Sequence, residues 1–480
     1  MEQAWQQVAQ RHAILRTRFR WEGLDQPEQQ VQRQIHLFLM QQDWQGLPLA
    51  AQQQQLETYL KSDRQQGFDL EHAPLMRLAL FHIARDTYQL VWTFHHILLD
   101  GRSFPILLKE VFAIYEALCQ GQNLQLESPR LYKEYIDWLQ QQDVAQSEAY
   151  WRQFLAGFTI PSVFSRELSN ATSETGQGEA AIQLSQTATA ALKTLAQQYQ
   201  ITPNTLLQGA WAIVLSHYSD TQDVVFGATR ACRHSVEGTE SMVGLLINTL
   251  PVRVHIAPQD SLISWLHDLR TQHVAIRPYE HTPLTQVQQW SEVPPGVPLF
   301  DSLVVFENSC LNETLQAFGS GWQNRTIKLL EQPSFPLVLR GSLGAELSLR
   351  VSYNRQQFSP VTMIEMLEQL TALLEEIIAD PEQPLANLSI WTKVEPHPLT
   401  MEWNATEIDY PKQLRLHDLF EAQVNRDPDA IAVIFGNHSL TYRQLNQRAN
   451  QLAHYLQQLG IQPEIPVGIC IERSLEMIIG

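Results

Sequence analysis

The chain has 480 residues, of which 44% are hydrophobic, and its formal net charge is −18. This composition favours packed cores over disorder, and the length suggests roughly two to four domains. The negative charge argues against nucleic acid as a partner and against binding to anionic membranes.

The first part of the chain mixes helix and strand patterns. It opens inside a helical spacing of apolar residues that has no preceding cap, from Ala4 to Leu15. Residues 76–83 and 88–95 are short runs rich in β-forming residues, and their short connection predicts a hairpin. Ser103 suits a helix cap, so we expect a helix from there to Leu118.

The second part repeats this mixture after a polar segment. Residues 165–179 are poor in large apolar residues, which predicts an exposed linker. Beyond it we expect a helix that opens at Thr202, two strands and a further amphipathic helix; the strands are at 224–226 and 250–256 and the last helix is at 363–378. Two α+β halves of similar size predict a two-lobed body.

A second break, rich in proline, lies near residues 393–415. It precedes four expected elements: a helix at 417–424, a strand at 430–435, a capped helix after Ser439 and a strand at 466–470. So short a segment predicts only the leading edge of a separate domain. The helical opening and the apolar end suggest that the chain is a fragment of a longer one.

The cysteines and the hydrophobic runs bear on compartment. No apolar run approaches the ~20 residues that span a bilayer, and the chain start lacks a signal-peptide core. The four cysteines are far apart and form no C-x-x-C pair, which predicts buried thiols and no metal site: Cys119, Cys232, Cys310 and Cys470. We therefore expect a cytoplasmic protein.

The sharpest motif is H-H-I-L-L-D-G at residues 95–101, where an expected strand gives way to a loop and then a helix. Histidine suits proton transfer near neutral pH, because its unperturbed pKa is ~6.5. Neighbouring side chains on a strand point to opposite faces, so one histidine should face a cleft and the other the fold. The residues alone leave open two core histidines with solvated tips.

This motif resembles the H-H-x-x-x-D-G signature of the condensation domains of nonribosomal peptide synthetases, which are similar in fold to chloramphenicol acetyltransferase. Ala13 replaces a glutamate and Glu134 an aspartate of the family's other motifs. Five further segments of the chain resemble these motifs and follow the family's order. They are residues 11–19 (RHAILRTRF), 132–138 (YKEYIDW), 243–253, 281–284 (loosely) and 299–308. The resemblance covers residues 1 to about 395.

The resemblance implies an α+β, two-lobed, chloramphenicol acetyltransferase-like pseudo-dimer with a central cleft. Residues 1–165 would form the amino-terminal lobe, 166–395 the carboxy-terminal lobe and 396–415 a linker. The family's first motif, S-x-A-Q-x-R-L-W, and the strand after it are absent, which removes part of the first lobe and of the tunnel wall. Residues 416–480 resemble the start of an α/β adenylation (AMP-binding) domain, since LTYRQL at 440–445 matches L-T-Y-x-E-L with Gln444 in place of the glutamate. This tail lacks the phosphate loop of such domains and is not expected to activate ATP.

The implied reaction is amide bond formation between a donor acyl or peptidyl thioester and an acceptor aminoacyl thioester. His96 would lie where two tunnels meet, as a base or as a group that orients the amine. Gly101 would offer a backbone N–H to the developing oxyanion. His95, Asp100 and Arg16 would support the motif, with Asp100 paired to Arg16.

The implied partners are upstream and downstream carrier domains, whose 4′-phosphopantetheine arms hold the substrates, and an adjacent adenylation domain. No cofactor or metal is expected to bind the domain itself, and neither nucleic acid nor a membrane is an expected partner. Two alternatives stay open: a carrier-binding scaffold that cannot condense, and an epimerisation-type relative, which the adenylation-like tail argues against.

Overall fold

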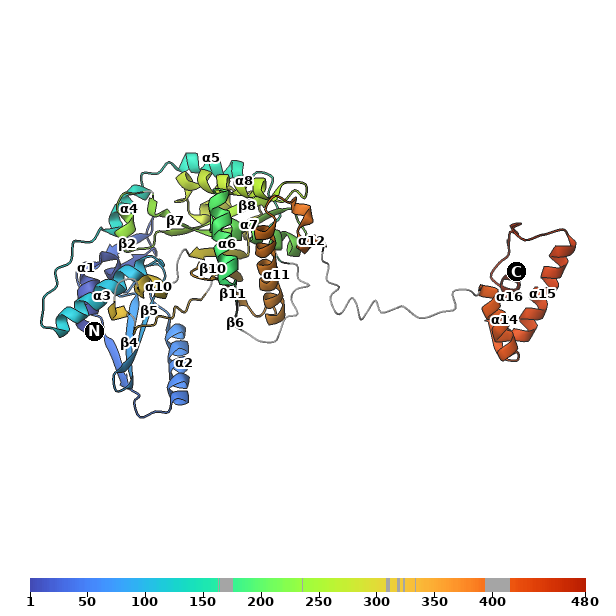
Figure 1. The fold of residues 1–480 in the computed structure, drawn as a ribbon, viewed down its shortest axis with the longest axis horizontal. Coiled ribbons are helices and arrows are strands. Elements are labelled where there is room, and N and C mark those ends of the chain that lie inside the picture. The colour runs from blue at the N-terminus through green and yellow to red at the C-terminus, as the bar shows by residue number, and fades with distance from the viewer. Residues whose placement is uncertain are drawn as a thin grey trace. The chain divides into compact units, whose positions relative to one another are not determined.

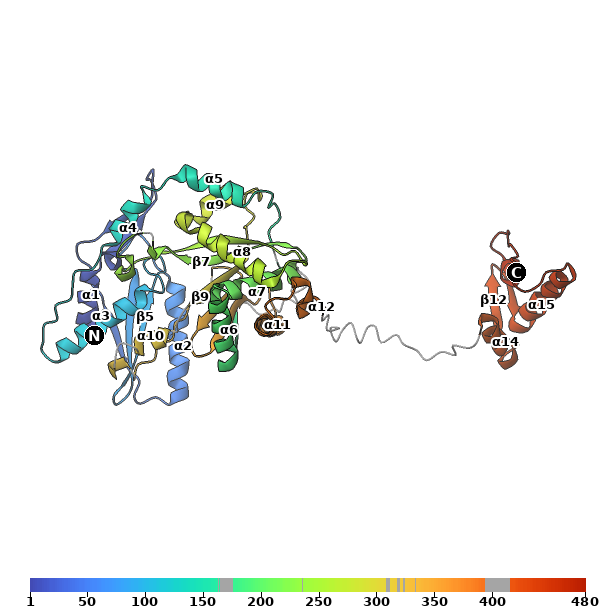
Figure 2. The same ribbon diagram turned by 45° about the horizontal axis from the view of Figure 1, so that its top comes forward.

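The computed structural model describes residues 1–162, 164, 176–234, 236–307, 311–316, 320–322, 324–332, 334–392 and 415–480. The chain forms two compact units, Met1–Val394 and Glu395–Gly480 (Figures 1 and 2). Each unit has its own helices and strands, so the polypeptide contains at least two separately folded parts.

The amino-terminal part of the first unit packs helices against a small sheet. Three strands form this sheet in the order β3-β4-β5: β3 (Leu39–Asp43), β4 (Met76–Ala84) and β5 (Thr87–Phe94). β3 runs parallel to β4, whereas β4 and β5 pair antiparallel, which confirms the predicted hairpin. A second, two-stranded ribbon pairs β1 (Thr17–Arg20) with β2 (Glu28–Val31).

The helices of this part are α1 (Glu2–Arg11), α2 (Leu49–Gln66), α3 (Ser103–Cys119), α4 (Tyr132–Leu139) and α5 (Val144–Phe154), with the 3-10 turn η1 (Ala13–Arg16) after α1. The predicted opening helix is confirmed, since Ala4, Trp5, Val8 and Ala9 of α1 are buried. α1 packs on α3, and their apolar residues share a core with β4. This core supports the segment between β5 and α3, which carries residues 95–101.

The second part of the first unit is built on a six-stranded mixed sheet in the order β6-β11-β10-β9-β7-β8. β9 runs parallel to both of its neighbours, and the other pairs are antiparallel. The strands are β6 (Gln177–Gln183), β7 (Asp223–Ala231), β8 (Ile247–His255), β9 (Ser302–Glu307), β10 (Leu337–Leu343) and β11 (Leu347–Asn354). β7 and β8 confirm the two strands predicted in this region.

The helices around this sheet include α6 (Gln186–Gln198), α7 (Pro203–Ser219), α8 (Leu262–Ala275), α9 (Leu284–Trp290), α10 (Leu311–Gln316), α11 (Pro360–Ala379) and α12 (Ser389–Thr392). The hydroxyl of Thr202 caps α7 by accepting from the Thr205 N–H, and Pro203 occupies the first turn, as the sequence predicts. Every residue of α7 from Thr205 to Ser216 is buried, because the helix lies between β7, α8 and α11.

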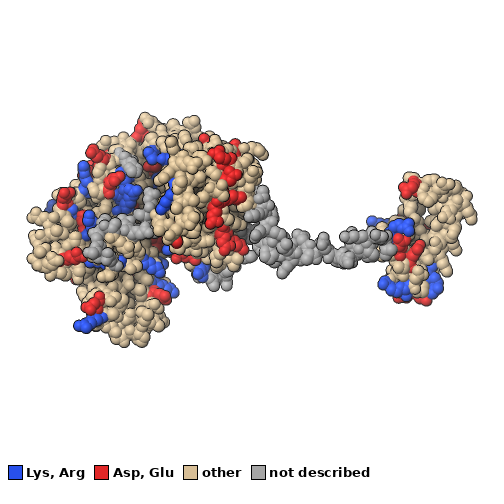
Figure 3. All heavy atoms as spheres, viewed as in Figure 1, with Lys and Arg blue, Asp and Glu red and all other residues tan. Residues whose placement is uncertain are grey.

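Charge is unevenly placed on this unit. Glu365, Glu368 and Glu375 recur on the exposed face of α11, and Figure 3 shows acidic side chains gathered over this part of the surface. Such a band repels phosphate backbones.

Several predictions of detail are wrong. Ser103 is the first residue of α3 rather than its cap, because its hydroxyl is held by Asp100. Residues 177–179 belong to β6 instead of a linker, since they pair with β11, while 165–175 lie outside the described residues. Cys119 and Cys470 are exposed; Cys232 is buried, and Cys310 is outside the described residues.

The second unit contains α14 (Leu416–Arg426), β12 (Ile431–Phe435), β13 (His438–Thr441), α15 (Tyr442–Gln458) and α16 (Leu475–Ile479). The predicted helix after Ser439 is α15, and its cap is Thr441. The predicted strand at 466–470 is wrong: in the described chain β12 and β13 pair only with each other, and these residues have no strand beside them. In neither unit does the described chain include a helix long and apolar enough to span a membrane.

Candidate active site

The segment from His95 to Arg102 joins the end of β5 to the start of α3. The His95 N–H donates to the Leu75 carbonyl at 3.0 Å, which ties the segment to the residue just before β4. The N–H groups of Leu98 and Leu99 donate to the carbonyls of His95 and His96, at 3.1 and 3.3 Å. The two histidines therefore stand at the start of a turn that its own backbone closes.

His95 contacts the fold. Its Nδ1 accepts a hydrogen bond from the Ile97 N–H at 3.1 Å, so the proton of the neutral imidazole is on Nε2. The ring meets that of Phe68 edge-on, with centroids 6.3 Å apart. Burial lowers the pKa of His95, and the neighbouring His96 lowers it further. His95 is therefore a neutral, positioned imidazole near pH 7.

His96 is exposed to solvent at the first position of the turn. This exposure does not fit a pair of core histidines, the alternative that the residues alone left open. It makes the His96 imidazole accessible to a reactant. The adjacent Gly101 is also exposed, and a Cβ added there would meet nothing within 4 Å. The backbone at the end of the motif is thus open on the side where a side chain would project.

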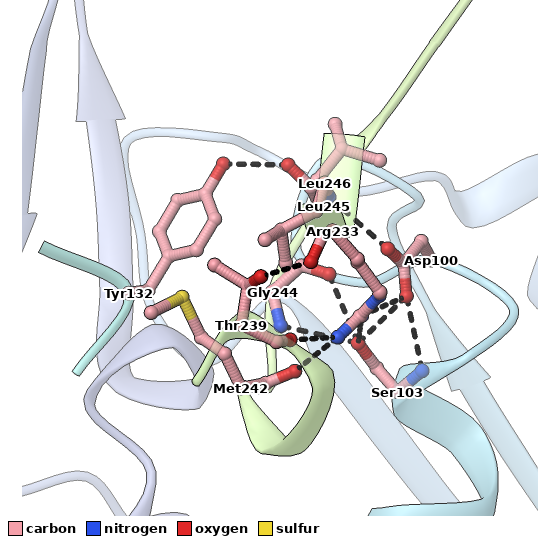
Figure 4. Close-up of polar contacts among 9 residues, drawn as sticks. All are labelled: Asp100, Ser103, Tyr132, Arg233, Thr239, Met242, Gly244, Leu245 and Leu246. Atoms are coloured by element: carbon pink, nitrogen blue, oxygen red, sulfur yellow. Dashed lines mark hydrogen bonds and ion pairs between the residues drawn. The ribbon is translucent and has the colours of Figure 1, made fainter. Parts of the chain in front are cut away.

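Asp100 is fully buried, and its carboxylate accepts hydrogen bonds from neighbouring protein groups (Figure 4). Its Oδ1 lies 2.6 Å from Nη2 of Arg233, 2.9 Å from the Ser103 hydroxyl and 3.0 Å from the Ser103 N–H. Its Oδ2 accepts from the Leu246 N–H at 3.1 Å. A buried carboxylate with this many hydrogen-bond donors is held in one position.

Arg233 supplies the counter-charge from the short 3-10 turn η3 (Cys232–His234), which follows β7. Neither side chain of the Asp100–Arg233 pair is exposed. Nη1 of Arg233 donates to the carbonyls of Thr239 and Met242, at 2.6 and 2.8 Å. The guanidinium therefore joins the turn before α3 to the segment between β7 and β8 (Figure 4).

The predicted pair between Asp100 and Arg16 is wrong. Arg16 lies just past the end of α1, so its guanidinium reaches main-chain carbonyls that the helix leaves free. It donates to the carbonyl of Ala9 at 3.0 Å and also to that of Gln32. Arg233 was missed because no motif singled it out. The available signal was an arginine directly after an apolar strand and beside a buried Cys232.

Gly244 lets the motifs at 95–101, 132–138 and 243–253 meet. Its carbonyl accepts from the Asp100 N–H at 3.2 Å and lies 2.9 Å from the Ser103 hydroxyl, to which its own N–H donates at 3.1 Å. Tyr132 covers this glycine and donates its hydroxyl to the Leu245 carbonyl at 2.8 Å. A Cβ at Gly244 would lie 2.1 Å from Cδ2 of Tyr132, so only glycine fits.

Gly244→Ala is accordingly expected to lower the free energy of unfolding by about 1–3 kcal/mol, the usual effect of overpacking a close contact. Gly101→Ala is the matched control, because open space at Gly101 admits a methyl group, and it is expected to shift stability by less than ~0.5 kcal/mol. Urea unfolding followed by tryptophan fluorescence measures both. Equal stabilities of the two variants would contradict the close packing of Gly244 and Tyr132.

Family comparisons assign the two parts of the chain. Residues 1–400 match the condensation domain family and residues 420–480 the AMP-binding enzyme family. A linear gramicidin synthase of Brevibacillus parabrevis is 44% identical over 99% of this chain. Bacitracin synthase 1 of Bacillus licheniformis is 34% identical over 100% of it. The chain spans 9% of each of these synthases, about a tenth of their length.

Solved structures share the fold. A four-domain nonribosomal peptide synthetase bound to AMP and glycine matches with a TM-score of 0.72 and 19% identity, over 96% of this chain and 36% of that one. The starter condensation domain of rhizomide synthetase matches with a TM-score of 0.64 and 20% identity, over 81% of this chain and 88% of that one. These matches confirm the predicted chloramphenicol acetyltransferase-like α+β fold. The chain therefore belongs to the condensation-domain family of nonribosomal peptide synthetases, and its carboxy-terminal unit is the start of an AMP-binding domain.

Proposed function

We propose that residues 1–395 form an amide bond between a donor acyl or peptidyl thioester and an acceptor aminoacyl thioester. Residues 1–165 and 166–395 are the two lobes, with His96 in the cleft between them, and 396–415 link them to the adenylation segment at 416–480. The observation that carries the proposal is the locked turn of residues 95–101. It exposes His96 while the buried Asp100–Arg233 pair fixes the backbone behind it.

The proposed chemistry joins the acceptor nitrogen to the donor carbonyl carbon. The C–N bond forms, the C–S bond of the donor thioester breaks, and the amine proton passes to the released thiolate. His96 accepts this proton or holds the amine for attack, a role worth about 10²–10⁴-fold in rate. The Gly101 N–H donates to the carbonyl oxygen as it becomes negative. His95, Asp100 and Arg233 keep the turn in place and do not touch the reactants.

The proposed partners follow from the substrates. Both acyl groups arrive on the phosphopantetheine arms of carrier domains, one upstream and one downstream, and the adjacent adenylation domain belongs to the same synthetase. The likeness to gramicidin and bacitracin synthases supports this multidomain setting. The two carrier domains hold the substrates together and so lower the entropic part of the activation barrier. The exposed His96 alone does not provide this effect.

A carrier-dependent condensation assay tests the proposal. Donor and acceptor carrier proteins, each loaded with its thioester, are mixed with the chain, and intact-protein mass spectrometry follows the acyl group on each carrier. We expect the donor acyl mass to move to the acceptor carrier while the donor carrier returns to its free thiol. A folded chain that binds both carriers but leaves each acyl group in place would contradict the proposal and favour a carrier-binding scaffold.

A further inference from the structure

One arginine binds the start of the loop between α2 and β4, residues 67–75. Arg77 of β4 donates from Nε to Oδ1 of Asp63 at 2.6 Å and from Nη2 to the Asp63 carbonyl at 2.7 Å. Its Nη1 donates to the Gly67 carbonyl at 2.6 Å. The Asp63 side chain is only 6% exposed, so this ion pair is largely shielded from water. The planar guanidinium thus fixes the end of α2 at three points.

The same guanidinium holds the first aromatic residue of the loop. Its central carbon lies 4.1 Å from the ring centroid of Phe68, within the range of a cation–π contact. Phe68 in turn meets the imidazole of His95 edge-on at 6.3 Å between centroids. At the other end of the loop, the Leu75 carbonyl accepts from the His95 N–H. One loop therefore contacts both the ring and the backbone of His95.

We infer that Arg77 is a positioning residue for the reaction: through Phe68 it holds His95, and with it the turn that presents His96. This inference rests on the proposed function of His96. We propose no contact between Arg77 and the reactants. Arg77 acts through the loop that carries Phe68, because it contacts the Phe68 ring and binds the neighbouring Gly67 carbonyl.

The Phe68 ring lies against the His95 imidazole and so contributes to its burial. Burial is the larger cause of the lowered pKa of His95, and the charge of His96 is the second. Arg77 and Asp63 pair with each other. Without the Phe68 ring, water reaches His95 and its pKa rises towards the ordinary value. Protonation of His95 would then place a positive charge in the turn that presents His96.

Histidine Cε1–H NMR of the 480-residue chain, titrated from about pH 5 to 8, tests this link without any carrier or substrate. His95→Gln assigns the His95 resonance by its loss. We expect Arg77→Ala and Phe68→Leu each to raise the pKa of His95, and the double variant to match Phe68→Leu alone. Arg77→Lys is expected to behave like Arg77→Ala, because an amine cannot form the fork. Arg85→Ala, at the exposed tip of the same hairpin, is the control and should titrate as wild type.

The inference fails if Arg77→Ala titrates like Arg85→Ala, or if the effects of Arg77→Ala and Phe68→Leu simply add. If Arg77→Ala does not fold, Phe68→Leu still decides whether the ring sets the His95 titration, since it keeps the Arg77 hydrogen bonds. In the condensation assay, Arg77→Ala and Phe68→Leu should each lower the single-turnover rate about tenfold. Each should also move the low-pH side of the pH–rate profile to higher pH. If the wild-type chain forms no amide in the condensation assay, the proposed function is refuted. If the pKa of His95 in Arg77→Ala equals that of the wild type, the role of Arg77 is refuted.

Discussion

Replacing Asp100 by alanine is expected to lower the free energy of unfolding of the first unit by about 3–5 kcal/mol. The variant leaves the guanidinium of Arg233 buried without a counter-charge, since neither side chain of the pair is exposed. It also removes the acceptor of the Leu246 N–H. A buried, unpaired charge is among the few mechanisms that produce losses of this size.

Urea unfolding of the chain measures this loss, and Asp137→Ala is the matched control. Asp137 pairs with Lys133 on the surface of α4, where both side chains are exposed, so its loss should change stability by less than ~1 kcal/mol. Equal losses from Asp100→Ala and Asp137→Ala would mean that the buried pair does not hold the unit together.

A double-mutant cycle identifies the partner of Asp100. Asp100→Ala and Arg233→Ala should be strongly non-additive, with a coupling on the order of 2–3 kcal/mol, because the second substitution removes the charge that the first leaves unpaired. Asp100→Ala and Arg16→Ala should add within about 0.5 kcal/mol. Coupling to Arg16 instead of Arg233 would reverse the assignment made from the structure.

Local signals in the sequence predicted local structure well. The β-rich runs at 76–83 and 88–95 form a hairpin, and Thr202 with Pro203 starts α7, because neighbouring residues decide a turn or a cap. The strand predicted at 466–470 was wrong for a related reason: an apolar run becomes a strand only where another strand is placed to pair with it.

The candidate site divides along the same line. The motif at 95–101 located His96 and its turn, because those residues are adjacent in sequence. The partner of Asp100 lies 133 residues further along the chain. A single sequence does not show which residues so far apart come into contact. Arg16 was a plausible partner by family motif, but the carbonyls at the end of α1 are closer to it. Phe68 and Arg77 were missed because their contacts with His95 and with the end of α2 join segments that are distant in the sequence.

His96→Ala is expected to lower the single-turnover rate of amide formation by about 10²–10⁴-fold, the range for a positioned acid–base group. An alanine at position 96 can neither accept the amine proton nor hold the amine. Because His96 is exposed, the change in unfolding free energy should stay within about 0.5 kcal/mol. The loss would therefore report chemistry rather than folding.

The control is His267→Ala, an exposed histidine on α8, which should retain wild-type amide formation. Comparing the two variants at equal carrier loading removes any general effect of losing an imidazole. The comparison also distinguishes a specific role of residues 95–101 from a general effect of removing a histidine from the surface.

The single-turnover rate of amide formation by His96→Ala, with saturating donor and acceptor carriers, tests the central claim most directly. We predict at least about a hundredfold loss relative to wild type, with an unchanged melting transition and full activity in His267→Ala. A His96→Ala chain that forms the amide at the wild-type rate would contradict the assignment of His96 and of the turn that presents it.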